Sequence, residues 1–274
     1  MSIFVVDKNK CTRDGACVSE CPIRIIELKD ENSVPTLLDG ADELCVKCGH
    51  CVAVCASGAL SHTAMTPEQC TPVRRDWLLN PEQTEHFLRA RRSVRTYKDH
   101  PVERHLLAKL IDIARFAPSG HNFQPVNWLV VYDRDKVRRF AGLVVDWMRH
   151  LMNEDPLTAK ARHMDLIVGL WETGIDAVCR SAPHLIIAHA PEDEGTAPAA
   201  CTIALTYLDL AAPSFGLGTC WAGFFNAASY LWPPLRQALG LPERHLSFGT
   251  MMVGYPKYAY HRLPLRNEAR ITWD

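Results

Sequence analysis

The chain has 274 residues, of which 47% are hydrophobic and 22% are charged, and its formal net charge is −1. This composition is typical of a globular protein with one large domain, or with one small and one medium domain. The near-zero charge argues against nucleic acid or an anionic membrane as a partner. No basic segment followed by an apolar run opens the sequence, which predicts a cytoplasmic protein without a signal peptide or membrane span.

The cysteines are distributed unevenly along the chain. Seven of the eleven lie between Cys11 and Cys55. The other four are scattered over the rest of the sequence: Cys70, Cys179, Cys201 and Cys220. A secreted disulfide scaffold would be short and rich in cysteine throughout. A dense block followed by an ordinary domain instead indicates a metal cofactor bound in the first 70 residues.

Residues 1–70 are predicted to form short strands and turns around the cysteines, with an opening strand over residues 3–6. Their second cysteine run, Cys45-x2-Cys48-x2-Cys51-x3-Cys55, is the bacterial [4Fe–4S] spacing with every ligand present. Gly49 allows the chain to bend closely around a cluster. The alternative is structural zinc, which favours two separated cysteine pairs rather than this tripled spacing.

The first cysteine run departs from that spacing at one position. It reads Cys11-x5-Cys17-x3-Cys21-Pro22, with Asp14 where a second cysteine is expected. Together the two runs resemble the bacterial two-cluster ferredoxins, in which the fourth cysteine of each run ligates the other cluster. The resemblance implies one ligand set of Cys45, Cys48, Cys51 and Cys21, and a second set of Cys11, Asp14, Cys17 and Cys55.

Asp14 leaves three interpretations open for the second set. A carboxylate is a harder ligand than a thiolate and suits iron–sulfur chemistry less well. The site can therefore hold a [4Fe–4S] cluster with one labile iron, or a [3Fe–4S] cluster. In the third interpretation Asp14 faces solvent and the site is degenerate. The survival of the other three ligands favours an occupied site.

Residues 71–83 are predicted to be a linker, and residues 84–274 a second domain. Asn80-Pro81-Glu82-Gln83 has the residues of a helix start with a capping box. A helix is predicted after Pro101, and buried strands over residues 128–132 and 185–188. Residues 199–212 are apolar nearly all round, which predicts a central helix covered on every side. A strand over residues 248–254 is expected to close the sheet.

Four segments of this domain carry candidate binding chemistry, whereas no strand–GxGxxG–helix unit for a dinucleotide is present. The segments are Arg91-Arg92-Ser93-Val94-Arg95-Thr96-Tyr97, Pro118-Ser119-Gly120-His121-Asn122-Phe123-Gln124-Pro125, residues 216–224 with 254–256, and the terminal run 260–264 with Arg262. In this order they resemble the nitroreductase family over residues 84–274. The resemblance implies an α+β fold, an α/β/α sheet with flanking helices, built as an intertwined homodimer with two FMN sites at the interface.

The same resemblance implies roles for individual residues. Arg91, Arg92, Ser93 and Arg262 would contact the FMN phosphate, a task suited to planar guanidinium groups. Arg95 would lie by the flavin pyrimidine edge. The other implied flavin contacts are Pro118 and Ser119 with Asn122 and Gln124 in the loop, and the backbone amides of Ala222 and Gly223 near the reactive N5. His121 is a candidate proton donor, with a hydrogen-bonded loop histidine as the alternative.

These features predict an FMN-dependent oxidoreductase with two iron–sulfur clusters. Electrons would enter through the clusters from a low-potential donor such as ferredoxin, pass to FMN, and leave to a small organic acceptor such as a nitroaromatic or a quinone. The alternative from another class is a non-enzymatic electron carrier or redox sensor. A flavin-free binding domain would leave the arginine run without a ligand.

Overall fold

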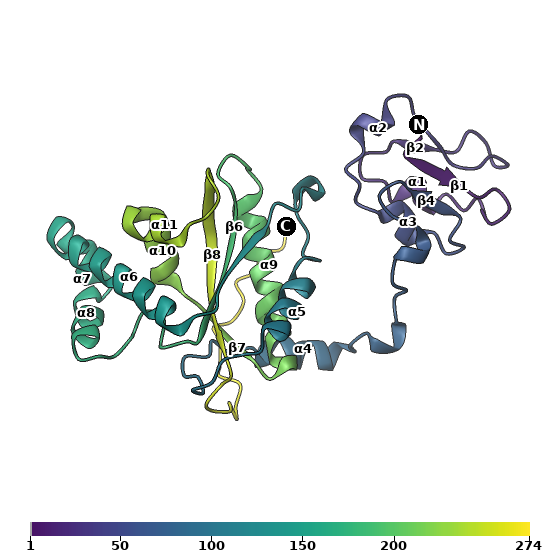
Figure 1. Cartoon of the computed structure of the whole chain (residues 1–274). Coiled ribbons are helices and arrows are strands. Elements are labelled where there is room, and N and C mark those ends of the chain that lie inside the picture. The colour runs from purple at the N-terminus through teal and green to yellow at the C-terminus, as the bar shows by residue number, and fades with distance from the viewer. Residues whose placement is uncertain (1) are drawn as a thin grey trace. The chain divides into compact units, whose positions relative to one another are not determined.

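The computed structural model describes residues 2–274, which divide into two compact units (Figure 1). The cysteine unit consists of the chain up to Leu78 together with residues 121–123. The sheet unit consists of residues 79–120 and 124–274. The main boundary, between Leu78 and Leu79, falls inside the segment that the sequence marks as a linker.

The cysteine unit contains two small antiparallel strand pairs. In the first, β1 (Phe4–Val6) pairs with β4 (Leu60–His62), and in the second, β2 (Ile26–Glu27) pairs with β3 (Thr36–Leu37). Its helices are single turns: α1 (Ala16–Ser19), α2 (Ala41–Leu44) and α3 (His50–Val54). The predicted opening strand is confirmed, and its pairing with β4 brings both ends of the cysteine block together.

Short helices lie on both sides of the boundary between Leu78 and Leu79. The short 3₁₀ helices η1 (Pro67–Gln69) and η2 (Arg75–Trp77) precede α4 (Pro81–Ala90). Asn80 Oδ1 accepts from Gln83 N at 2.8 Å, and Asn80 N donates to Gln83 Oε1 at 3.1 Å. The capping box predicted for the start of α4 is therefore confirmed.

Four antiparallel strands form the sheet of the sheet unit, in the order β5-β6-β8-β7. They are β5 (Asn127–Val131), β6 (His184–Pro191), β7 (Gly218–Trp221) and β8 (His245–Gly254). The prediction that residues 248–254 close the sheet is wrong, because β8 lies between β6 and β7. No strand is predicted over residues 218–221, so the outer strand β7 is missing from the prediction.

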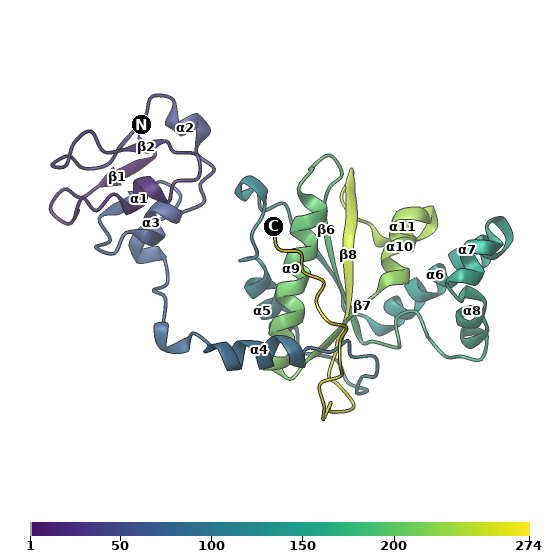
Figure 2. The same ribbon diagram turned by 180° about the vertical axis from the view of Figure 1, so that it is seen from behind.

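Helices cover both faces of this sheet (Figures 1 and 2). Strand β6 shows why: Leu185 and Ile187 enter one core cluster, while Ile186 and Ala188 enter the other, as alternate residues of a strand must. On the second face lie α5 (Arg104–Ala114) and α9 (Ala197–Ala211). The first face carries α6 (Arg134–Glu154), α7 (Pro156–Ala161), α8 (Met164–Glu172), α10 (Gly223–Leu231) and α11 (Pro233–Leu239). The predicted α/β/α arrangement is confirmed.

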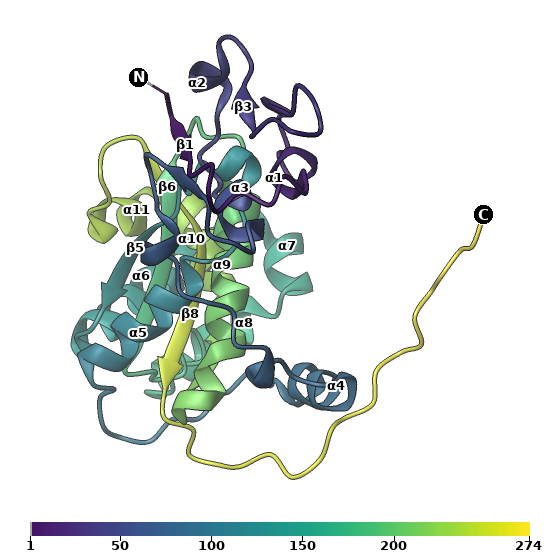
Figure 3. The ribbon, with the colours of Figure 1, turned by 90° about the vertical axis from the view of Figure 1, so that its right-hand side faces the viewer.

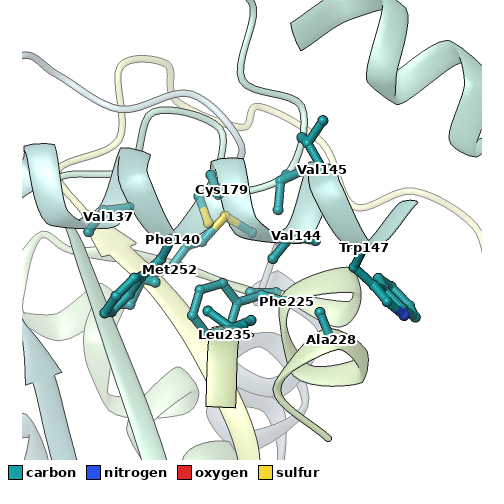
Figure 4. Packing of buried hydrophobic residues seen from close by; sticks show 14 of the residues in the cluster. Val137, Phe140, Val144, Val145, Trp147, Cys179, Phe225, Ala228, Leu235 and Met252 are labelled. Carbon is teal, nitrogen blue, oxygen red and sulfur yellow. The ribbon is translucent and has the colours of Figure 1, made fainter. Parts of the chain in front are cut away.

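The larger core lies under α6. Figure 4 shows Phe140 and Val144 of this helix facing Phe225 of α10, with Leu235 and Met252 beside them. Phe225 is fully buried, and its ring centroid is 6.3 Å from that of Phe140. Burying side chains of this size contributes roughly 1.5–3 kcal/mol each, so this cluster is a main source of stability for the sheet unit.

Helix α9 differs from its prediction on one side. Leu205 and Leu208 are fully buried, but Thr206 is exposed and Tyr207 is 39% exposed. The prediction that this helix is covered on every side is therefore wrong for the single chain. After Ala211 the helix tightens into the 3₁₀ turn η4 (Ala212–Phe215), which contains Pro213.

The chain leaves the sheet after β8 and runs to Asp274 as an extended segment (Figure 3). Residues 257–274 of this segment are exposed throughout. Within residues 2–274, no helix combines the length and the apolar character needed to cross a membrane.

Candidate functional site

The cysteine-rich loop before α3 depends on one glycine. Gly49 has φ +76°, in the left-handed region, and stands as the N-cap of α3. A Cβ atom on Gly49 would lie 2.5 Å from the sulfur of Met65. Any other residue would therefore be strained in its backbone and crowded by Met65. Glycine here lets the Cys45–Cys51 loop turn tightly, as the sequence predicts.

Two separate cavities in the cysteine unit gather the predicted ligands. Residues from both cysteine runs line the first, including Cys21, Cys45, Cys48 and Cys51. The remainder of its lining is mainly apolar, with Phe4, Ile25 and Ile26 among the buried residues. This cavity therefore contains all four members of the ligand set that the resemblance gave for a complete cluster, with Cys21 crossing over from the first run.

The second cavity gathers the remaining set. Its lining includes Cys11, Asp14, Cys17 and Cys55, and here it is Cys55 that comes from the other run. Three soft sulfur donors converging on one cavity fit an iron–sulfur cluster, although the lining here also includes the polar residues Thr12, Arg13 and Ser57. Within residues 2–274, no group of three or more His, Cys, Asp or Glu residues is placed to hold a single metal ion.

One predicted ligand in each cavity has a raised pKa. The pKa of Cys51 is raised to about 11, mainly by burial and also by the neighbouring Cys48, Cys45 and Cys21. Burial also raises the pKa of Cys17, with Cys55 as its next cause. Thiols in such surroundings keep their protons until cationic iron replaces them.

Asp14 occupies the exposed edge of the second cavity. The Ala16 N–H donates to Asp14 Oδ1 at 3.0 Å, and the Thr12 hydroxyl donates to Asp14 Oδ2 at 2.9 Å. These hydrogen bonds, the backbone one first, hold the pKa of Asp14 below its ordinary value. The carboxylate is thus charged at neutral pH and fixed in direction, as a ligand to iron needs to be.

The arginine run follows the end of α4, and its first member is engaged within the protein. Arg91 Nη1 lies 3.3 Å from Asp209 Oδ2 of α9. Asp209 is buried and also accepts a hydrogen bond from the Thr219 hydroxyl of β7. Arg91 therefore ties α4 to α9 and β7 through a buried carboxylate.

Arg92 has the clearest unmet bonding capacity in the run. Among the described residues, its Nε atom is buried and has no hydrogen-bond partner. Arg92 lines an open cleft of about 610 Å³ in the sheet unit, together with Lys98 and Lys257. A buried donor without a partner, beside two further cations, fits an anionic group such as a phosphate.

The next residues of the run lie against β7. Val94 N donates to Thr219 O at 2.8 Å, and a Cβ atom on Gly218 would lie 2.5 Å from Val94. The carbonyl of Ser93 accepts hydrogen bonds from Arg95 Nη1 and from the Tyr260 hydroxyl, each at 3.3 Å. Tyr260 thereby brings the start of the C-terminal segment, two residues before Arg262, to the arginine run.

The loop over residues 118–125 has an unusual backbone. His121, Asn122 and Gln124 all have positive φ angles, of 48°, 55° and 48°. Left-handed conformations of residues other than glycine are costly and cluster at functional sites. Gln124 N donates to the hydroxyl of Ser119 at 2.9 Å, and Pro118 is exposed.

Residues 121–123 of that loop form part of the cysteine unit. Asn122 Nδ2 donates to the carbonyls of Val46 and Lys47, at 3.2 and 3.1 Å, inside the Cys45–Cys48 loop. His121 is exposed and stacks on Phe123 with ring centroids 5.5 Å apart. Asn122, which the resemblance assigns to the flavin, thus makes these hydrogen bonds to the loop between the predicted cluster ligands Cys45 and Cys48.

The two backbone amides predicted to contact the flavin, those of Ala222 and Gly223, lie between β7 and α10 and differ in their surroundings. Ala222 N donates to Thr250 O at 2.9 Å, so the sheet uses this amide. Gly223 begins α10 and is exposed, and amides in the first turn of a helix have no partner within the helix. Cys220 is buried in β7, as a thiol that packs in a core would be.

The arrangement defines an iron–sulfur module joined to an α/β/α oxidoreductase domain. Residues 88–255 match the nitroreductase family, and residues 9–59 match the 4Fe-4S dicluster domain. The chain belongs to the nitroreductase family of oxidoreductases and carries a 4Fe-4S dicluster domain at its N-terminal side.

Two relatives and a solved structure each match about two thirds of the chain. A putative NADH dehydrogenase/NAD(P)H nitroreductase from Archaeoglobus fulgidus is 27% identical over 176 residues, which are 64% of this chain and 87% of that protein. An NADH dehydrogenase from Thermus thermophilus is 29% identical over 200 residues, 67% of this chain and 92% of that protein. A Bacteroides fragilis nitroreductase solved with bound FMN has a TM-score of 0.57 at 22% identity, covering 71% of this chain and 98% of that one.

Proposed function

We propose that the protein is an FMN-dependent oxidoreductase that passes electrons from two iron–sulfur clusters through FMN to a small organic acceptor, such as a nitroaromatic or a quinone. The observation that carries the proposal is the pair of cavities, each lined by four predicted cluster ligands, in the same chain as a nitroreductase-family domain. Such acceptors take two electrons and two protons, whereas a cluster delivers one electron at a time. Bound FMN supplies the capacity to collect two electrons.

The sheet unit supplies the groups that would bind FMN. Nitroreductases from Bacteroides fragilis and Desulfitobacterium hafniense, solved with bound FMN, share its fold. Arg92 and Arg262, with the hydroxyl of Ser93, would hold the phosphate, and the partnerless Nε of Arg92 supports this assignment. Arg95 would place positive charge at the pyrimidine edge, and the amide of Gly223 would face N5.

Arg91 has a different role in this proposal. Its ion pair with the buried Asp209 orients the arginine run. Arg91 would then have two roles. It would contact the phosphate itself, and it would hold Arg92 and Ser93 in place to bind the same group. Gln124, Pro118 and Ser119 remain predicted flavin contacts, and His121 remains a predicted proton donor.

We further propose that the chain forms a homodimer. The exposed Tyr207 on α9 and the exposed Phe87 and Leu88 on α4 are apolar side chains that a second copy could cover. The extended C-terminal segment contributes Leu265 and Trp273, which are 93% and 88% exposed. Apolar groups so exposed favour an intertwined dimer in which this segment wraps the partner.

Asp14 is proposed as the fourth ligand of the second cluster. An Asp14→Cys variant should keep four irons in this cluster and resist oxygen better than the wild type, because thiolate replaces a hard oxygen ligand. Electron paramagnetic resonance of the reduced and air-exposed proteins measures both properties. Identical spectra of the two proteins would show that Asp14 is not a ligand.

The clusters, rather than NAD(P)H at the flavin, are proposed as the main source of electrons. A protein that begins at Asn80 should keep FMN and its dithionite-driven reduction of acceptors, but lose reduction by reduced ferredoxin. The full-length Cys48→Ser variant should show the same loss, and Cys70→Ser, outside both ligand sets, should not.

The competing hypothesis is that NAD(P)H donates electrons directly to the flavin, as the name of the Archaeoglobus fulgidus relative, a putative NADH dehydrogenase/NAD(P)H nitroreductase, suggests. Turnover of the shortened protein with NADH, as fast as that of the full chain with any donor, would refute the relay. Cluster and flavin reduction without turnover of any acceptor would instead favour an electron carrier.

A further inference from the structure

His62 is a buried histidine at the wall of the cavity for the complete cluster. It is the last residue of β4, opposite Phe4 of β1, and only 5% of it is exposed. It lines the same cavity as Cys21, Cys45 and Cys48. Neither cysteine run contains it, and its position results from the pairing of β4 with β1.

The hydrogen bonds of the imidazole fix which nitrogen carries the proton. Ala64 N donates to Nδ1 of His62 at 2.8 Å, so Nδ1 presents a lone pair. A neutral imidazole then carries its hydrogen on Nε2. Nε2 lies 3.5 Å from Sγ of Cys45, so it is the donor and the sulfur is the acceptor.

We propose that His62 tunes the complete cluster by donating an N–H···S hydrogen bond to Cys45, an inference that rests on the iron–sulfur function proposed above. Hydrogen bonds to ligand sulfurs are one of the determinants of cluster potential. A donor stabilises the more negative, reduced state of the cluster and so raises its reduction potential.

The two cavities differ in this respect. Cys45 Sγ also accepts from Lys47 N at 3.4 Å, and Cys55 Sγ in the second cavity accepts from Ala59 N at 3.3 Å. The side-chain neighbour of Cys55 is the Ser57 hydroxyl, 3.7 Å away. A rotatable hydroxyl at that distance is a weaker donor than a buried ring held in one orientation. His62 therefore acts on one cluster and not on the other.

The test is a redox titration of intact, fully loaded protein, followed by electron paramagnetic resonance. In His62→Leu, reduction of the complete cluster should become about tenfold less favourable, which for a one-electron couple is a downward shift of about 59 mV. The second cluster should not move. His62→Gln, which keeps an N–H near the position of Nε2, should lie closer to the wild type.

His50→Leu is the matched control, because His50 lines the same cavity but is exposed, and no described hydrogen bond joins it to a cysteine sulfur. Full iron content with unchanged potentials in His62→Leu would overturn the inference, and so would equal shifts of both clusters. A wild-type protein without iron would instead refute the proposed function.

A measurement on the wild type avoids dependence on the folding of the variant. Reduced protein with ¹⁵N-histidine should show a nitrogen coupling to the complete cluster by electron–nuclear double resonance. The coupling should persist in His50→Leu. Its absence in the wild type would also overturn the inference.

Discussion

The two units of the chain differ in what holds their buried side chains together. In the cysteine unit the strands are two or three residues long, and the core cluster includes the predicted ligands Cys17 and Cys21. In the sheet unit, strands of up to ten residues pack between two helical layers, and aliphatic and aromatic side chains fill both cores. One unit is built around its candidate ligands, and the other around apolar packing.

The two units are therefore expected to differ in what stabilises them. A small unit with single-turn helices buries too little apolar surface to be stable without a metal or other crosslink. Bonds from iron to cysteine would then supply the folding free energy of the cysteine unit. The sheet unit needs no such bonds, and its cofactor would bind to a scaffold that is already folded.

Removing iron should have the largest effect and should act on one unit. With a chelator under reducing conditions, the cysteine unit should unfold, because its ligands no longer have a common centre. Hydrogen exchange followed by mass spectrometry measures this: peptides from residues 2–62 should lose protection, while those covering β6 and β8 should keep it. Unchanged protection in residues 2–62 would mean that packing alone holds the cysteine unit.

Shortening one buried side chain should lower the stability of the sheet unit without affecting the cysteine unit. Phe225→Ala should destabilise the sheet unit by about 3–5 kcal/mol, because it removes a fully buried aromatic ring beneath α6. The iron content should not change. Phe116→Ala is the control, since Phe116 is 69% exposed. Denaturant unfolding followed by tryptophan fluorescence gives the free energy of unfolding of both variants. Loss of iron in Phe225→Ala would show that the units depend on each other.

The sequence predicts best those features that depend on neighbouring residues. The spacing of Cys45, Cys48 and Cys51 needs only a short loop, and the Asn80 capping box needs only one turn of helix. Both could be predicted because the chemistry lies within a few residues. The grouping of Cys21 and Cys55 with the opposite runs came from the ferredoxin resemblance.

The features that escaped prediction involve distant parts of the chain. The position of β8 inside the sheet depends on β7, a four-residue strand without a distinctive pattern. The ion pair of Arg91 with Asp209 joins residues 118 positions apart. His62 had no signal in the cysteine spacing, and only the pairing of β4 with β1 brings it to Cys45.

The arginine run allows a smaller test inside the sheet unit. Arg92→Ala and Arg262→Ala should each weaken FMN binding by about 1.5–3 kcal/mol, the range for hydrogen bonds to charged groups. Arg91→Ala should weaken binding and also lower stability, because it leaves Asp209 buried without its cation. Fluorescence titration of the flavin-free protein measures affinity, with the exposed Arg89→Ala as control. Unchanged FMN retention in Arg92→Ala and Arg262→Ala would refute the phosphate assignment.

Acid should produce the smallest effect, and again in one unit. His189 of β6 is 6% exposed, and its Nδ1 lies 2.9 Å from Nδ1 of His245. Burial first, and then His245, lowers the pKa of His189 to about 4, from an ordinary value of 6.5. Between these values the unfolded chain binds a proton that the folded chain excludes. Stability of the sheet unit should therefore be independent of this group above about pH 6.5, and should decrease by up to about 1.4 kcal/mol per pH unit as the pH falls towards 4. Hydrogen exchange of β6 peptides across this range measures the decrease without interference from acid damage to the clusters.

His189→Asn should flatten the pH dependence of the stability, and the exposed His163→Asn should leave it intact. An equal slope in His189→Asn and the wild type would assign the acid sensitivity to other groups.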